Sequence, residues 1–262
     1  MKLLALHNRR EIESFLNNQS IDNYFYHCSH LESGFWEYTQ WFGLCDGGEI
    51  LALAMLIMKY DQPVLLASSY QEGDSHQLLL LQRLRPYLPR NIYCHLDRHV
   101  AEKVFGQHAD MRVTPFLNMK WTGQQDSLSH YDPGSIHQLG MADMKEIVSF
   151  LETSHPGHLI DEDFIQRGGF VALKENNTII SMAGVVAQSD QYRVVSIGNV
   201  ATHPDHRRKN LASQTISALI HLLSPTYQTI TLNVKAANHA AIRCYQKLGF
   251  EETGVFDEVI FS

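Results

Sequence analysis

The sequence has few cysteines, no long apolar run and no low-complexity tract. Its four cysteines, Cys28, Cys45, Cys94 and Cys244, are widely spaced and form no Cys-x-x-Cys pair. This spacing predicts reduced thiols in a cytoplasmic protein rather than a disulfide framework. The apolar stretches 3–6 and 50–58 are too short for the core of a signal peptide or for a membrane span. These absences argue against export and against insertion into a bilayer.

Basic residues are outnumbered by acidic ones, and this limits the partners that we expect. Asp and Glu total 28 against 21 Lys and Arg, which gives a formal net charge of −7. Such a balance disfavours a general binder of nucleic acid or of anionic membranes. His203 with His206, and His95 with His99, have spacings compatible with a metal, but no carboxylate or cysteine completes either set. We therefore expect no metal, no nucleic acid and no membrane partner.

What the chain does have is the composition of a globular protein. Hydrophobic residues make up 44% of its 262 residues, enough to fill the cores of roughly one to two domains. The periodicity of apolar residues predicts two similar series of helices and strands. The first series has helices at 9–16, 21–28, 77–88 and 99–105 and strands at 41–46, 50–60, 63–68, 91–96 and 112–121. The second has helices at 141–153, 161–166, 211–223 and 239–248 and strands at 169–174, 178–188, 194–202, 229–234 and 255–261.

A polar stretch rich in turn-forming residues, 123–134, separates the two series and is the expected linker. The predicted organisation is therefore a domain at 1–123, a linker at 124–134 and a second domain at 135–262.

The most informative stretch runs from Val194 to Ala212 and predicts a strand, a basic loop and a helix. Pro204 cannot donate a backbone hydrogen bond and ends the strand. Beyond Leu211, apolar residues recur at steps of three and four, as on the buried face of a helix. A loop placed there presents unpaired backbone amides and the positive end of the helix dipole together. The pattern therefore predicts a phosphate-binding loop.

The residues of this loop resemble the pyrophosphate-binding segment of the GCN5-related N-acetyltransferases (GNATs), written Arg/Gln-x-x-Gly-x-Gly/Ala. Arg207 takes the first position and Ala212 the last, whereas Asn210 stands where the family has glycine. Glycine serves at that place because the backbone must approach phosphate closely, often at a positive φ. Asparagine tolerates the left-handed region better than other non-glycine residues, so the loop can keep its form.

A second match follows an alternating strand, 229–234, which we expect to be half-buried. Residues 238–250 are similar to the family pattern Asn-x-x-Ala-x-x-x-Tyr-x-x-x-Gly-Phe, with Asn238, Tyr245 and Gly249 in their places. Asn238 is a natural N-cap, and Gly249 is a natural residue just beyond a helix end. The two motifs span 194–250, and weaker agreement extends the resemblance upstream to about Ser135.

The resemblance implies an α/β chain with two GNAT-like domains, each a mixed and mostly antiparallel sheet flanked by helices. It also implies acetyl-CoA as cofactor and Tyr245 as the general acid that protonates the leaving thiolate, since a phenol with a pKa of about 10 stays protonated. The strand before the loop is expected to diverge from the next strand, with Gly198 and Asn199 marking a bulge. The implied cofactor-binding residues are Val200, Thr202, Arg207, Arg208, Lys209, Asn210, Leu211, Ala212, Asn238 and Tyr245.

No general base stands out in the sequence. Asp161, Glu162 and Asp163 are candidates by position and His203 by its pKa, and deprotonation relayed through water stays open.

The first half lacks the features that carry the resemblance. Aligning 98–105 with 238–245 places Arg98 opposite Asn238 and Phe105 opposite Tyr245, and the segment 68–76 is acidic rather than basic. We interpret the first half as a degenerate GNAT-like domain that serves stability, substrate recruitment or dimer contacts, which makes a homodimer one expected assembly.

The predicted function is that of an acyltransferase: an acetyl-CoA-dependent N-acetyltransferase acting on a primary amine of a small molecule or peptide. Two alternatives stay open. One is a non-catalytic acyl-CoA-binding or regulatory module, which asparagine in the glycine position favours. The other is a transferase of a longer acyl group. The acceptor cannot be named, because specificity in such folds resides in loops and fold does not determine function.

Overall fold

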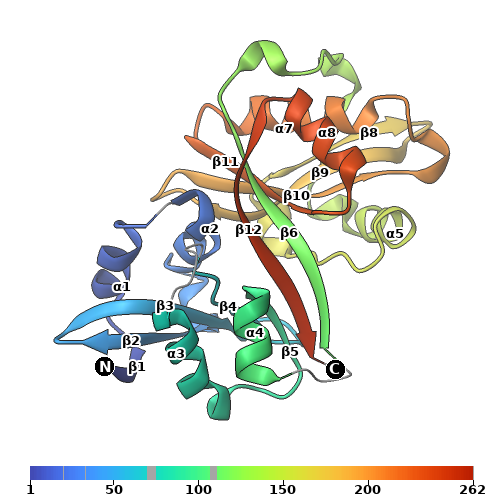
Figure 1. Cartoon of the computed structure of the whole chain (residues 1–262). Helices are drawn as coiled ribbons and strands as arrows, with labels where there is room; N and C mark the ends of the chain where they lie inside the picture. The colour runs from blue at the N-terminus through green and yellow to red at the C-terminus, as the bar shows by residue number, and fades with distance from the viewer. Residues whose placement is uncertain (20, 33, 70–74, 107–110, 262) are drawn as a thin grey trace. The chain divides into compact units, whose positions relative to one another are not determined.

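A computed structural model describes residues 1–19, 21–32, 34–69, 75–106 and 111–261, and it separates into two compact units (Figure 1). Unit 1 consists of residues 1–118, 235–237 and 253–262, and unit 2 of residues 119–234 and 238–252. In this division the C-terminal strand is shared between the two units, whereas the sequence predicts it within the second domain.

The C-terminal strand, β12 (Phe250–Phe261), begins in unit 2 and continues in unit 1. There it pairs antiparallel with β5 (Ile92–Leu96), from Asp257 opposite Leu96 to Phe261 opposite Ile92. The backbone N–H of Arg98 donates to Asp257 Oδ2 at 2.9 Å, across 159 residues of sequence. Local patterns do not reveal such a distant pairing, because they record only which residues are apolar.

The predicted linker is an ordered part of unit 2. It contains single turns of 3-10 helix at Gln125–Ser127 and Pro133–Ser135. The backbone N–H of Ser129 donates to Ser217 Oγ at 2.9 Å, and Tyr131 Oη lies 3.2 Å from His221 Nδ1. These contacts join the segment to the helix that follows the basic loop.

Unit 1 is a mixed sheet in the order β1-β2-β3-β4-β5-β12, in which only β4 and β5 of the pairs described run parallel. Apolar residues of α3 and α4, among them Leu80, Leu84 and Val104, pack in one buried cluster with Leu65 and Cys94 of the sheet. Figure 1 shows these two helices beside the strands of unit 1. The elements are β1 (Lys2–Leu6), α1 (Arg9–Leu16), α2 (Ile21–His30), β2 (Thr39–Asp46), β3 (Glu49–Ile57), β4 (Val64–Leu66), α3 (Ser75–Leu84), β5, α4 (Arg98–Phe105) and β6 (Met111–Trp121), whose last residues lie in unit 2.

A second buried cluster in unit 1 contains ionisable side chains. His27 of α2 and His95 of β5 are 3% and 8% exposed. The His27 ring contacts Trp41, and the His95 ring contacts Tyr26 and Phe256. Burial lowers the pKa of each histidine to about 3, because a charged imidazole loses its hydration there.

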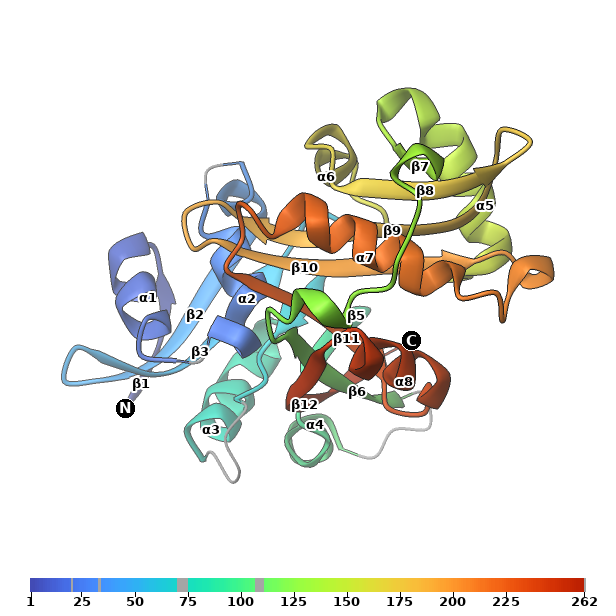
Figure 2. The ribbon, with the colours of Figure 1, turned by 90° about the horizontal axis from the view of Figure 1, so that it is seen from above.

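Unit 2 has the strand order β11-β10-β9-β8-β7, with β10 and β11 parallel and the other pairs antiparallel. Helix α7 packs along β9 and β10, as Figure 2 shows. Its buried residues include Ile216, Leu219 and Leu223, the stripe that the sequence predicts. The elements are β7 (Ile136–Gln138), α5 (Met144–Ser154), α6 (Glu162–Gln166), β8 (Phe170–Glu175), β9 (Thr178–Ser189), β10 (Val194–Thr202), α7 (Leu211–Leu223), β11 (Thr229–Lys235), α8 (His239–Lys247) and β12.

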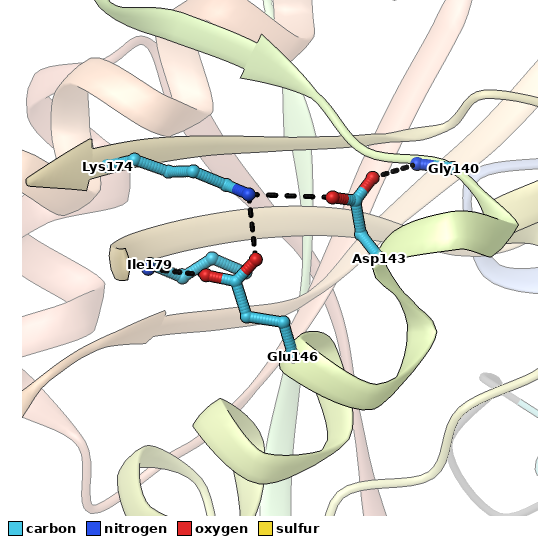
Figure 3. A network of polar contacts seen from close by, with 5 residues as sticks. All are labelled: Gly140, Asp143, Glu146, Lys174 and Ile179. Atoms are coloured by element: carbon cyan, nitrogen blue, oxygen red, sulfur yellow. Dashed lines mark hydrogen bonds and ion pairs between the residues drawn. The ribbon is translucent and has the colours of Figure 1, made fainter. Parts of the chain in front are cut away.

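An ion-pair network fixes α5 to β8 and β9 (Figure 3). Lys174 Nζ lies 2.7 Å from Glu146 Oε2 and 3.4 Å from Asp143 Oδ1, and its side chain is only 10% exposed. The backbone N–H of Ile179 donates to Glu146 Oε1 at 2.9 Å, and that of Gly140 to Asp143 Oδ2 at 3.0 Å. The hydrogen bond to Glu146 raises the pKa of Lys174, because it stabilises the charged ammonium.

The expected elements agree with those observed to within a few residues at each end, with three differences. The short strands β1 and β7 were not predicted, and β12 begins five residues earlier than expected. The prediction of a half-buried strand at 229–234 is wrong, because Thr229 and Thr231 are buried along with their apolar neighbours. In the described part of the chain there is no helix long and apolar enough to cross a bilayer.

Candidate functional site

The basic loop between β10 and α7 adopts the backbone that the resemblance requires. Asn210 has φ 60° and ψ 17°, the left-handed conformation that explains why glycine is usual at this place. Arg208, two residues earlier, also has a positive φ of 64°. Left-handed residues spaced in this way turn backbone N–H groups toward one side of a loop, where they can bind an anion.

Asn210 also leaves the first backbone N–H groups of α7 without a side-chain cap. It occupies the N-cap position, but its side chain makes no capping hydrogen bond to the helix. In contrast, Asn238 caps α8, since its Oδ1 accepts from the N–H of Ala241 at 3.2 Å. The first amides of a helix have no partner within the helix. Those of Leu211 and Ala212 are therefore placed to bind a phosphate at the positive end of the α7 dipole.

Arg207 holds the loop through hydrogen bonds to two backbone carbonyls, and the next two residues are also basic. Its Nε donates to the carbonyl of Thr202 at 3.3 Å, and its guanidinium also reaches the carbonyl of Ser154, the last residue of α5, at 3.5 Å. Arg208 and Lys209 are exposed. Arg207 is exposed as well, and it differs from the other two in its hydrogen bonds to backbone carbonyls.

Strands β10 and β11 separate just before the loop. They pair from Val194 opposite Thr229 to Ile197 opposite Leu232, whereas β10 continues to Thr202 and β11 to Lys235. This confirms the expected divergence.

The expected bulge accompanies the separation. Between Gly198 and Ala201 the register with β9 shifts by one residue, and Asn199 in the bulge has φ 49°. The Asn199 amide donates to the carbonyl of Leu159 at 3.1 Å and so holds the bulge in place.

The backbone N–H and C=O of Thr202 point away from β9, toward the side where β11 would lie if its pairing with β10 continued. The N–H of the next residue, His203, donates to Ile180 of β9 at 2.9 Å. Backbone groups of successive residues in a strand point to opposite sides, so those of Thr202 point away from β9. The Thr202 carbonyl accepts from Arg207, and the contact of Thr202 with the pantetheine arm that the resemblance implies stays a prediction. The role implied for Val200, which lies within the bulge, stays a prediction.

Tyr245 is buried on α8, 8% exposed, and its ring packs 6.0 Å from that of Phe250. Burial raises the pKa of the phenol, and the neighbouring Cys244 adds to the effect. The hydroxyl therefore stays protonated throughout the physiological range and has a proton to donate. Gly249 ends the helix with φ 84°, as its position in the motif predicts.

The candidate general bases make local contacts. Asp161 is the N-cap of α6 and accepts from the N–H of Asp163 at 3.1 Å, and Glu162 is exposed in the first turn. His203 Nδ1 accepts from the N–H of Asp205 at 3.4 Å. Their catalytic role stays a prediction.

Two residues that the sequence analysis did not single out lie where β10 and β11 separate. Among the described residues, Ser196 Oγ and Asn233 Oδ1 are buried side-chain atoms without a hydrogen-bond partner. The only sequence signal is a polar residue within each of two largely apolar strands.

Unit 1 has no such opening at the corresponding parallel pair. The N–H of Ala67 donates to the carbonyl of His95 at 3.0 Å, and that of Ser69 donates to Asp97 Oδ2 at 3.3 Å, so β4 and β5 stay joined beyond their last paired residues. Asp97 brings a carboxylate to the N-terminus of α4, where it disfavours phosphate.

The alignment of α4 with α8 needs a correction of one residue. The N-cap of α4 is Asp97, so Asp97 rather than Arg98 corresponds to the N-cap Asn238. Val104, rather than Phe105, then corresponds to Tyr245, and the phenol is absent in either alignment. Glu72 and Asp74 of the acidic segment lie outside the described residues.

Comparison with known proteins agrees with this geometry. Residues 136–250 match the family model described as the acetyltransferase (GNAT) family. Residues 136–250, somewhat less than half of the chain, are therefore similar to GNAT acetyltransferases. Among curated proteins, none matches the chain.

Solved structures resemble the chain over its whole length. A Drosophila protein is 14% identical with a TM-score of 0.71, covering 99% of this chain and 98% of its own. A GCN5-related N-acetyltransferase-like protein from Streptococcus suis is 16% identical with a TM-score of 0.61, covering 97% and 98%. A tandem GNAT protein from the clavulanic acid biosynthesis pathway is 10% identical with a TM-score of 0.59, covering 99% and 97%. These similarities show a two-domain GNAT fold.

Proposed function

We propose that the chain is an N-acetyltransferase that transfers the acetyl group of acetyl-CoA to a primary amine of a small molecule or peptide. The observation that carries this proposal is the left-handed Asn210 at the start of α7, because it gives the loop a glycine-like backbone and leaves the first amides of the helix uncapped. Arg208 and Lys209 add positive charge beside the pyrophosphate.

The reaction needs the thioester held, an amine brought to its carbonyl, and protons moved. The amine nitrogen forms a bond to the carbonyl carbon, the carbon–sulfur bond breaks, the amine loses a proton to water, and the sulfur receives one. Tyr245 is the proposed donor of that last proton. The phenol is buried and protonated, on the helix capped by Asn238.

Binding and turnover test the proposal separately. Acetyl-CoA should raise the melting temperature, and calorimetry should give one site per chain, since unit 1 has a carboxylate at the N-terminus of α4 and its parallel strands β4 and β5 stay joined. Thiol release should then follow addition of an amine from a panel of hydroxylamine, an amino sugar, a polyamine and a lysine-containing peptide.

Each result decides between named functions. Binding without turnover of any amine would favour a non-catalytic acyl-CoA-binding module. Faster release from butanoyl-CoA than from acetyl-CoA would favour a longer acyl group. A chain that binds neither coenzyme A nor its acetyl ester would refute the proposal.

A further inference from the structure

Three side-chain hydroxyl groups form a hydrogen-bonded cluster between the end of β10 and the first turn of α7. Ser181 Oγ, on β9, lies 3.0 Å from Thr202 Oγ1 and 3.4 Å from Thr215 Oγ1. It also lies 3.2 Å from the carbonyl oxygen of Ala201. Thr202 ends β10, and Thr215 lies on α7. The cluster therefore joins the strand before the phosphate loop to the helix after it.

The Thr215 hydroxyl extends the cluster into the first turn of α7. Its Oγ1 donates to the carbonyls of Leu211 at 3.2 Å and of Ala212 at 3.0 Å. A hydroxyl has one proton to donate and two lone pairs that accept, so Thr215 can accept from Ser181 while it donates to the helix. Both Thr215 and Ser181 are fully buried. Water therefore does not compete for these bonds.

The two carbonyls that accept from this hydroxyl belong to peptide units at the start of the helix. The C=O of Leu211 shares a peptide unit with the N–H of Ala212, and the C=O of Ala212 shares one with the N–H of Ser213. The N–H of Gln214 donates to the carbonyl of Asn210 at 3.3 Å, and the two earlier N–H groups have no acceptor within the helix. A hydrogen bond to a carbonyl polarises the peptide unit and makes its N–H a stronger donor.

A purely structural role does not explain threonine at this position. A hydroxyl bonded to the carbonyl four residues earlier slightly destabilises a helix and often bends it. Leucine or alanine would also favour the helix more than threonine does. Thr215 therefore weakens α7 at the turn whose N–H groups face the proposed phosphate site.

This inference rests on the proposed function, because it concerns how the loop binds acetyl-CoA. We infer that Thr215 and Ser181 are positioning residues for the diphosphate of acetyl-CoA. Both are buried, so they act through the backbone and do not touch the cofactor. Thr215 strengthens the N–H groups of Ala212 and Ser213 as donors to the diphosphate. Ser181 holds the end of β10 and the Thr215 hydroxyl in one arrangement.

Calorimetry with acetyl-CoA and with ADP tests this inference. ADP carries a diphosphate but no pantetheine arm. Thr215→Val keeps the shape of the side chain and removes the hydroxyl, so the Kd for acetyl-CoA should rise about fivefold. The Kd for ADP should rise by the same factor, because the effect lies in the N–H groups that bind phosphate. Thr215→Ser keeps the hydroxyl and should hold both values within about twofold of the wild type.

The matched control is Thr231→Val, the same substitution at another fully buried threonine. The Thr231 hydroxyl donates to the carbonyl of Val195 at 3.3 Å, where β10 and β11 are still paired. This variant should bind acetyl-CoA and ADP as the wild type does. Ser181→Ala should weaken both ligands, but less than Thr215→Val, because Thr215 then still donates to the helix. A melting curve for each variant shows that it is folded.

The outcomes separate this inference from the function on which it rests. An unchanged Kd in Thr215→Val overturns the inference alone. A loss of affinity for acetyl-CoA without one for ADP also overturns it, because the hydroxyl would then act on the pantetheine arm. So does an equal loss in Thr231→Val, or a wild-type chain that binds acetyl-CoA but not ADP. A wild-type chain that binds neither acetyl-CoA nor coenzyme A overturns the proposed function as well.

Discussion

Replacing Asn210 tests the conformation on which the phosphate loop depends. An L-residue pays about 1–2 kcal/mol for the left-handed region, and asparagine pays less than alanine because its side chain can bond locally. Asn210 is exposed, so its replacement costs little packing. Asn210→Ala should therefore lose about 1 kcal/mol of unfolding free energy. Asn210→Gly should stay within about 0.5 kcal/mol, since relief of strain offsets the greater freedom of the unfolded chain.

Coenzyme A affinity should change with the same free energy. A cost of about 1 kcal/mol lowers the population of the left-handed loop about fivefold, and the apparent Kd rises by up to the same factor. Isothermal titration calorimetry with acetyl-CoA measures the Kd, and urea unfolding measures the stability.

Asn177 provides a matched control for this experiment. It has φ 61° in the exposed turn between β8 and β9, so Asn177→Ala pays the same backbone cost away from the loop. Its Kd should equal that of the wild type. The reasoning would be refuted if both alanine variants lost the same stability and bound acetyl-CoA equally well.

Three further predictions concern other parts of the chain. Tyr245→Phe should bind acetyl-CoA normally but lose at least about 100-fold in kcat, and an unchanged kcat would exclude the phenol as general acid. Lys174→Met should lower the free energy of unfolding in urea by about 1–3 kcal/mol, because Glu146 and Asp143 lose the cation that they share. Glu146→Gln should lower it by less, because Lys174 keeps Asp143 as a partner. His27 has a pKa of about 3 in the folded protein against 6.5 in the unfolded chain. Its contribution to the free energy of unfolding is therefore complete above pH 6.5 and falls as the pH drops toward 3. At pH 5 the loss is about 2 kcal/mol, and the His27→Leu variant should show a correspondingly smaller fall in urea midpoint between pH 7.5 and pH 5 than the wild type.

Local chemistry explains why much of the site could be predicted. Asn210, Asn238 and Gly249 act through their own backbone conformation or through atoms within three residues, so their roles follow from the sequence around them. The bulge at Asn199 was predictable for the same reason. Helix ends also follow from nearby residues, and the predicted elements agree with those observed apart from β1, β7 and the start of β12.

Features that depend on pairing distant strands could not be predicted. The place where β10 and β11 separate is set by their register, and the position of Ser196 and Asn233 beside it appears only once that register is known. The burial of Thr229 and Thr231 has a similar origin, because both faces of β11 are covered. Periodicity alone indicates one apolar face and cannot show that the polar face is covered too.

The pairing of β12 with β5 has a consequence for how the protein is made. The strand that completes the sheet of unit 1 is synthesised some 160 residues after its partner, so β5 leaves the ribosome with one edge unpaired while unit 2 is still being translated. Cotranslational folding therefore cannot finish unit 1 first, and an exposed strand edge persists until β12 emerges.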